Sequence, residues 1–178
     1  MFHSNTELLI DYWRRLRGER AVPARAAIDP TEFAPLAPRA FVANRDSGGD
    51  FELRLAGEMV IDLCGRPLRG MPVSHLWRLA HRRRLAGLLK ATLNAGEPLV
   101  IRAEAWTNDA ANLRLEILFL PLTGPDGAAD RFLGLYQPTA GTARPPIGEL
   151  ALLSAYGVAD ETTRAHLRLA TLDGRRIA

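Results

Sequence analysis

Residues 99–122 read LVIRAEAWTNDAANLRLEILFLPL, and this stretch decides the fold class. Apolar and polar side chains alternate on both sides of a short polar segment, which is the pattern of strands with one buried face. The four residues 108–111 between the two halves are typical of a turn. Strands joined by so short a loop can pair only in antiparallel fashion. The sequence therefore predicts a hairpin of two strands, at 99–107 and 112–122.

The two faces of this hairpin differ in composition. One face is apolar, should meet helices, and carries Ile101, Ala103, Ala105, Leu113, Leu115, Ile117 and Phe119. The other face carries charges that suit cross-strand pairing, at Arg102, Glu104, Arg114 and Glu116. Towards one end this second face becomes apolar, at Trp106, Leu118 and Leu120. We expect a second layer of structure to cover that apolar end.

Three further strands are expected, each bounded by turn residues: two before the hairpin, at 40–43 and 51–55, and one after it, at 131–137. The apolar face of the sheet should also receive Phe51, Leu53 and Leu55. Glycines and prolines between 57 and 77 exclude a long helix there, and a longer helix is predicted from about 76 to 94. The predicted fold is therefore α+β: a five-stranded antiparallel sheet with its helices inserted between strands two and three.

An amphipathic helix is predicted at the N-terminus. Ser4 and Glu7 have the spacing of a capping box, and Gly18 marks the end. Its apolar stripe at helical spacing consists of Leu8, Leu9, Tyr12, Trp13 and Leu16. The stripe has no partner within its own segment. It must pack on the sheet, where it would cover the apolar end of the second face, or on a second copy of the chain.

Several short segments, in this order and spacing, carry a resemblance to a known family. They are Tyr12-Trp13 followed by Ile28-Asp29-Pro30, Arg54-Leu55-Ala56-Gly57, the stretch LCGRPLRG at 63–70 leading to His75-Leu76-Trp77, LFLPL at 118–122, and Leu133-Gly134. Together they cover about residues 8–138. The chain resembles PAS-domain family 5, a largely proteobacterial set, and the order of its elements is that of PAS domains. The resemblance implies a sensory or protein-interaction role in signalling.

The chain divides into three segments. Residues 1–30 form the helix and linker, 31–138 the PAS-like domain, and 139–178 an extension outside the resemblance. Within the extension, 166–172 alternate in hydrophobicity, so we expect an edge strand there or a mobile tail.

Charge is concentrated in one part of the chain. The 178 residues carry 23 basic and 20 acidic groups, yet residues 63–96 hold seven basic groups and no acid. The rest is net acidic, so the charge belongs to a local surface. We expect a cationic contact surface at the start of the long helix, formed by Arg78, Arg82, Arg83 and Arg84. The cluster is either simply solvated or bound by something acidic. An acidic protein partner or an anionic small ligand suits it better than nucleic acid, because the one aromatic side chain of this segment, Trp77, is assigned to the core and is not free to stack on bases.

A ligand pocket, if open, should lie between the long helix and the apolar sheet face. Its expected wall consists of Leu53, Trp77, His81, Leu85, Leu115, Ile117, Phe119 and Tyr136. This wall has few polar groups and would suit a small apolar or amphipathic molecule. No cofactor is predicted.

Haem and flavin are the two cofactors of PAS domains whose binding residues can be compared with this sequence. Haem-binding members ligate iron through a histidine on the long helix, and His81 is the candidate here. Members that bind flavin covalently resemble one another in a Gly-Arg-Asn-Cys-Arg-Phe-Leu stretch. Here Leu68 stands where that cysteine would be, so a photoadduct is not expected. Cys64, one residue before the glycine, is interpreted as a small buried apolar side chain.

No residue constellation predicts catalysis or a metal site, and an enzyme is the least favoured class. The single cysteine, the lack of a signal peptide and the lack of an apolar run long enough for a membrane span favour the cytoplasm. The first hypothesis is a non-catalytic PAS-like sensory or interaction module that forms a homodimer. The alternative is an adaptor or dimerisation module whose core is filled by side chains. A haem-binding gas sensor and a nucleic-acid-binding regulator rank below both.

Overall fold

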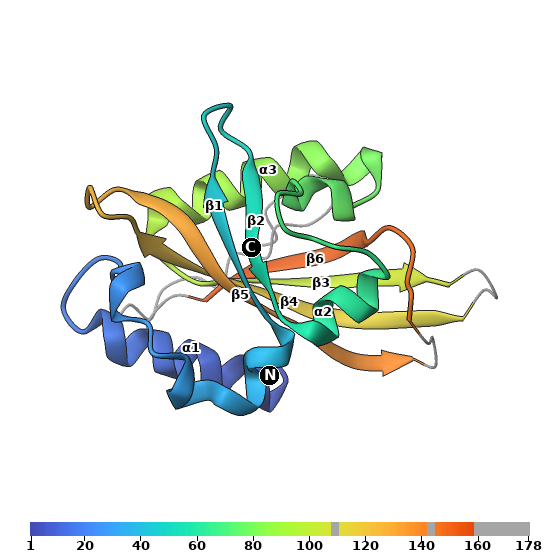
Figure 1. Ribbon diagram of the computed structural model, residues 1–178, viewed down its shortest axis with the longest axis horizontal. Helices are drawn as coiled ribbons and strands as arrows, with labels where there is room; N and C mark the ends of the chain where they lie inside the picture. The colour runs from blue at the N-terminus through green and yellow to red at the C-terminus, as the bar shows by residue number, and fades with distance from the viewer. Residues whose placement is uncertain (108–110, 142–144, 159–178) are drawn as a thin grey trace, which may run out of the picture.

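The computed structural model describes residues 1–107, 111–141 and 145–158. It has the predicted α+β architecture, in which helices cover both faces of one antiparallel sheet (Figure 1). The elements in chain order are α1 (Ser4–Arg17), η1 (Arg25–Ala27), η2 (Pro30–Arg39), β1 (Ala40–Arg45), β2 (Phe51–Ala56), α2 (Glu58–Cys64), η3 (Val73–Leu76), α3 (Leu79–Ala95), β3 (Leu99–Trp106), β4 (Asn112–Thr123), β5 (Ala129–Gly141) and β6 (Ala151–Gly157).

The sheet has six strands in the order β2-β1-β5-β4-β3-β6, one more than predicted. The predicted hairpin is present, with Leu99 opposite Phe119 and Trp106 opposite Asn112. The additional strand β6 pairs antiparallel with β3 at the sheet edge. It lies in the extension, while the alternating segment 166–172 falls outside the described residues.

The inner face of the sheet meets α2, η3 and α3 in the larger of two hydrophobic clusters. The apolar face predicted for the central hairpin lies entirely within this cluster. From β6, Leu152 and Ala155 join it as well. Burial of these side chains is the main stabilising contribution to the fold.

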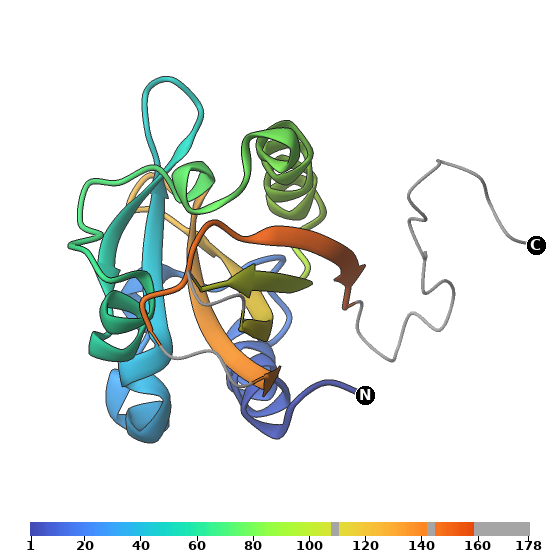
Figure 2. The same cartoon turned by 90° about the vertical axis from the view of Figure 1, so that its right-hand side faces the viewer.

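The outer face is covered by α1, which lies across the sheet from α3 (Figure 2). Trp13 is fully buried, and its indole Nε1 donates a hydrogen bond to the carbonyl oxygen of Pro121 at 2.8 Å. Leu118 and Leu120 pack in the same cluster, as predicted. The prediction for Trp106 was wrong: it is 41% exposed, because it lies at the opposite end of β3 from the strand region that α1 covers.

A β-bulge corrects the prediction for Leu55. Val42 pairs with Leu55 and Ala43 with Leu53, so Arg54 is the extra residue on β2. An inserted residue shifts the alternation by one position. Leu55 is consequently 54% exposed instead of facing the inner cluster.

The ends of two helices also differ from prediction. The cap of α1 is His3, whose Nδ1 accepts a hydrogen bond from the backbone N–H of Asn5 at 3.1 Å, so Ser4 is already helical. The helix ends at Gly18 as expected. The long helix begins at Leu79, so Trp77 lies in the connection before it rather than on it.

A polar network joins the start of α1 to the middle of the outer face. The carboxylate of Glu116, only 4% exposed, accepts hydrogen bonds from His3 N at 2.8 Å and Thr6 Oγ1 at 3.1 Å. The guanidinium of Arg102 lies 3.6 Å from the same carboxylate. A buried charge needs such partners, so this network fixes where the helix lies on the sheet.

Candidate functional site

The interior between α3 and the inner sheet face is filled by side chains. Seven of the eight residues expected to line a pocket lie together in the larger cluster, and none of the seven is more than 2% exposed: Leu53, Trp77, Leu85, Leu115, Ile117, Phe119 and Tyr136. Phe41 packs between the rings of Phe119 and Tyr136, with 5.4 Å between ring centroids in each pair. These residues therefore form a packed aromatic and aliphatic core.

The eighth residue, His81, is half-buried and is not part of this cluster. It lies in the first turn of α3, where its backbone N–H donates to the carbonyl oxygen of Arg78 at 2.8 Å. His81 is therefore more accessible to solvent than the other seven residues. The residues that the structure describes also contain no group of three or more His, Cys, Asp or Glu side chains that could hold a metal ion.

Two polar atoms in this core have no hydrogen-bond partner: Nε1 of Trp77 and the hydroxyl of Tyr136. Burial raises the pKa of Tyr136 well above its usual value, and the nearby Cys64 adds to the effect. An unpaired buried donor costs free energy, so each marks a place where a small polar group could bind.

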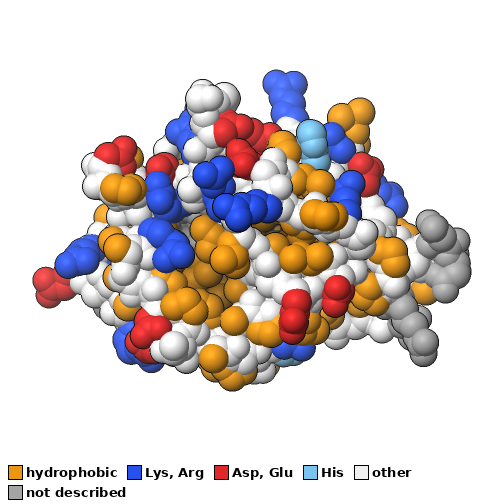
Figure 3. Space-filling view, viewed as in Figure 1, with side chains coloured by type: hydrophobic (Ala, Val, Ile, Leu, Met, Phe, Trp, Pro, Cys, Tyr) orange, Lys and Arg blue, Asp and Glu red, His pale blue; other side chains and the backbone are white. Residues whose placement is uncertain are grey.

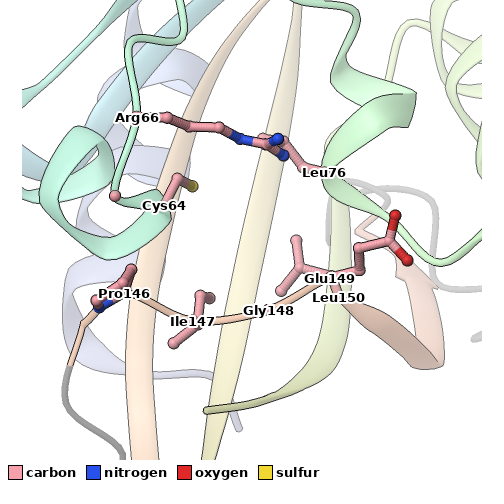
Figure 4. A pocket seen from close by; sticks show the side chains of 9 residues that line it. Cys64, Arg66, Leu76, Pro146, Ile147, Gly148, Glu149 and Leu150 are labelled. Carbon is pink, nitrogen blue, oxygen red and sulfur yellow. The ribbon is translucent and has the colours of Figure 1, made fainter. Parts of the chain in front are cut away.

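A pocket of about 330 Å³ opens beside this core, between the end of α2, η3 and the segment 146–150 (Figure 4). Its lining consists of Cys64, Gly65, Arg66, Leu76 and residues 146–150. In Figure 4 the side chain of Arg66 extends across the pocket towards Leu76. Sequence reasoning missed the segment 146–150, although an apolar Ile147 between a Pro-Pro pair and a glycine is an unusual loop composition.

Gly65 makes the close approach of this segment possible. It has φ 65°, and a Cβ at this position would overlap the side chain of Pro146. Glycine is the residue that adopts this left-handed conformation without strain. The end of α2 and the segment 146–150 can therefore lie against each other only because residue 65 lacks a side chain.

Cys64 lies in the wall of the pocket and is half-buried. Burial raises the pKa of its thiol to about 11, and the positive charge of Arg66 opposes this shift only in part. This agrees with the interpretation of Cys64 as a small apolar side chain, because the thiolate is the reactive form.

Alkylation tests this environment. At pH 8 iodoacetamide should modify Cys64 at least about 100-fold more slowly than a free thiol of pKa about 8.5, and the rate should rise roughly tenfold per pH unit up to pH 10. Intact-mass spectrometry measures the rate, and the protein unfolded in urea is the control. The folded state retains its proton to higher pH than the unfolded state, so the free energy of unfolding should also fall over this pH range. A rate that levels off below pH 9 would contradict the assigned environment.

The cationic residues do not form one uniform surface. Arg78 and Arg83 are exposed, and basic side chains gather in the upper half of the face shown in Figure 3. Arg82 instead donates from Nε to the carbonyl oxygen of Trp77 at 2.9 Å and pairs with Glu149 at 3.0 Å. Arg84 is half-buried. Among these arginines, Leu79 is 78% exposed, an apolar side chain beside free positive charge.

The apolar stripe of α1 packs on the sheet. Leu9, Tyr12 and Trp13 are buried in the outer cluster, and Leu16 packs against it. The prediction for Leu8 was wrong, because its side chain is 50% exposed. A dimer would therefore have to form through a different surface unless the helix left the sheet. None of the helices in the described residues has the length and apolar character needed to cross a membrane.

The chain matches one family model and is similar to several solved structures. The family model described as "PAS domain" matches residues 1–137. Among solved structures, a LOV protein of Rhodobacter sphaeroides is similar at 15% identity and a TM-score of 0.47, over 64% of this chain and 69% of that one. The light-state structure of the blue-light photoreceptor Aureochrome1 LOV aligns at 12% identity and a TM-score of 0.47, over 61% of this chain and 86% of that one. An RNA-binding Light-Oxygen-Voltage receptor aligns at 14% identity and a TM-score of 0.47, over 61% of this chain and 33% of that one. No curated protein matches the chain.

Proposed function

The chain belongs to the PAS domain family, and on this basis we propose that it is a non-catalytic sensory and protein-interaction module in signalling. The interior supports an emphasis on protein contacts, because seven of the eight residues expected to line a pocket are at most 2% exposed. We place the module in the cytoplasm as part of the same proposal, since a single unpaired thiol suits a reducing compartment.

The observation that carries the interaction role is the surface formed by Arg78, Leu79 and Arg83, which we call the α3 docking surface. Both arginines are exposed, and Leu79 is 78% exposed at the start of α3. Arginines around an apolar side chain are typical of residues that dominate protein interfaces. The partner should therefore be an acidic protein that covers Leu79 and pairs with the two arginines.

A photo-crosslinker tests this assignment. With benzoylphenylalanine in place of Leu79, ultraviolet light should link the chain to an acidic protein in a lysate of the source organism. The partner, once identified and purified, should bind the Arg78→Glu/Arg83→Glu variant at least about tenfold more weakly, because two attractive contacts become repulsive. Titration calorimetry at two salt concentrations measures the loss.

The matched control is Arg20→Glu/Arg45→Glu. It makes the same change in net charge at two exposed arginines outside the α3 docking surface. The control variant should keep the wild-type affinity. Equal weakening in both double variants, or crosslinks to nucleic acid alone, would overturn the proposal.

A second role, binding of a small apolar or amphipathic molecule between α3 and the sheet, is supported by one specific observation. The Trp77 indole and the Tyr136 hydroxyl are buried there without partners. A small ligand with a polar group could satisfy either atom if the surrounding side chains moved. Haem has weaker support, because His81 is half-buried in the first turn of α3, whereas these two atoms are fully buried.

A further inference from the structure

We propose that the pocket between α2, η3 and the segment 146–150 binds a small amphipathic carboxylate, with its charged group on Arg66 and its apolar part against Leu76, Ile147 and Leu150. The proposal rests on the proposed sensory function and names the class of signal molecule. It places the ligand outside the packed core, in a cavity that is already open at about 330 Å³. Cavities of this size are at the lower end of the range for small-molecule sites.

The walls of the pocket are fixed by backbone hydrogen bonds. Ile147 N donates to the carbonyl oxygen of Leu63 at 2.8 Å, which ties the segment to α2. Leu150 N donates to the carbonyl oxygen of Leu76 at 2.9 Å, which ties it to η3. Gly148 N, between them, donates to the carbonyl oxygen of Trp106 at 2.8 Å. A ligand would therefore enter a preformed site and would not bear the cost of ordering these walls.

The charges of the pocket favour an anion at one end. Arg66 is exposed and forms no ion pair with any residue in the described ranges 1–107, 111–141 and 145–158. The acid in the lining, Glu149, is already paired with Arg82 at 3.0 Å. Arginine binds a carboxylate through two parallel hydrogen bonds, which a neutral alcohol cannot reproduce.

The opposite part of the pocket is apolar. Leu76 and Leu150 belong to the larger cluster, and Ile147 and Cys64 pack against it. Burial keeps the Cys64 thiol neutral near pH 7, so this wall carries no charge of its own. A ligand with a short hydrocarbon body would bury it against these four side chains.

One wall of the site lies beyond the residues that the family model matches. The family model ends at residue 137, whereas one whole wall consists of residues 146–150. The same wall reaches the α3 docking surface, because Glu149 of the lining holds Arg82, one residue before Arg83. A carboxylate bound to Arg66 would repel Glu149, and a shift of Glu149 would change its ion pair with Arg82 on the α3 helix that carries the proposed partner contact.

Octanoate and octan-1-ol are the probes for the test, because they share a hydrocarbon chain and differ in charge. Octanoate should bind the full chain in titration calorimetry and slow the alkylation of Cys64 at pH 9. The Arg66→Ala variant should bind it about tenfold more weakly, as expected for the loss of a charge-assisted pair at an exposed arginine. Octan-1-ol should bind both proteins equally and more weakly than octanoate binds the wild type.

Arg69→Ala is the matched control, since it removes an exposed arginine three residues away that does not line the pocket. It should keep the wild-type affinity for octanoate. For each variant, the rate of Cys64 alkylation with octanoate is compared with the rate of the same variant without octanoate, because removal of Arg66 also changes the pKa of the thiol. The Arg66→Lys variant keeps the positive charge and should retain part of the affinity for octanoate. This result would show that the weaker binding of Arg66→Ala comes from the lost charge and not from a loss of the fold.

Three results would overturn the carboxylate site: no octanoate binding by the wild type up to 10 mM, equal loss in Arg66→Ala and Arg69→Ala, or tight binding without protection of Cys64. The crosslink at residue 79 is measured independently. If the crosslink to an acidic partner persists while octanoate fails to bind, only the ligand site is wrong. If octanoate binds as expected and the partner is not captured, the interaction role fails and the ligand site stands.

Discussion

Replacement of Trp13 by alanine should lower the free energy of unfolding by about 4 kcal/mol, which is the usual cost of removing a large aromatic side chain from a core. The side chain is fully buried between α1 and the outer face of the sheet. Its Nε1 also donates to the carbonyl oxygen of Pro121 at 2.8 Å, and the substitution leaves that buried acceptor unpaired. Urea unfolding followed by far-ultraviolet circular dichroism measures the change.

Two variants separate the causes of this loss. Trp13→Phe keeps most of the packing and removes the hydrogen bond, so it should cost only about 1 to 2 kcal/mol. Leu8→Ala, at a position of the same helix that is 50% exposed, should change the stability by less than about 0.5 kcal/mol. If Trp13→Ala costs less than 1 kcal/mol, α1 does not hold the outer face as described.

The elements that the sequence predicted well are those whose pattern repeats over many residues. The hairpin of β3 and β4 alternates at 101–105 and 112–117, and its pairing places Arg102 opposite Glu116 and Glu104 opposite Arg114. The apolar end of the outer face also pointed to a covering helix, because such a surface does not remain exposed in a small domain. The stripe predicted for α1 had no partner of its own, and its apolar character matched that surface.

The errors arose where a single residue or a distant contact decided the structure. One extra residue at Arg54 turns Leu55 outward, and no local pattern marks a bulge of this kind. The strand β6 depends on pairing with β3, about 50 residues earlier in the chain, and its own alternation is broken by a second bulge opposite Arg102 and Ala103. Composition alone could not assign it.

The candidate site was likewise predicted only in part: the sequence indicated the residues of the expected wall and did not indicate the open pocket. Side chains of the predicted pocket wall share an apolar pattern, and seven of them do lie in one cluster. The pattern cannot say whether the space between them is open, because that depends on how side chains from β1, β4 and β5 interlock, as the rings of Phe41, Phe119 and Tyr136 do. The open pocket was missed because one wall comes from segment 146–150, which reaches α2 through tertiary contacts at Leu63 and Gly65.

The second large effect is expected at Gly134, where alanine should cost about 3 kcal/mol of unfolding free energy, the upper part of the usual range for overpacking a core. Gly134 lies in the middle of β5, between Phe41 on β1 and Phe119 on β4. A Cβ there would overlap the ring of Phe41 and would lie 2.6 Å from the carbonyl oxygen of Leu118. Thermal and urea unfolding of the variant measure the loss.

The two neighbours of Gly134, the backbone of Leu118 and the ring of Phe41, differ in whether they can make room for a Cβ atom. The backbone of Leu118 is held in the β4–β5 ladder and cannot retreat, whereas the ring of Phe41 can be shortened. The loss caused by Gly134→Ala should therefore be at least about 1 kcal/mol smaller in a Phe41→Leu background than in the wild type, a coupling typical of residues in direct contact. Gly157→Ala, at a strand glycine with nothing within 4 Å of its Cβ position and no positive φ, controls for the general cost of replacing a glycine in the sheet. If the Gly134 and Phe41 substitutions were simply additive, the strain would lie in the ladder alone, and the aromatic ring would not be what requires glycine at the centre of the sheet.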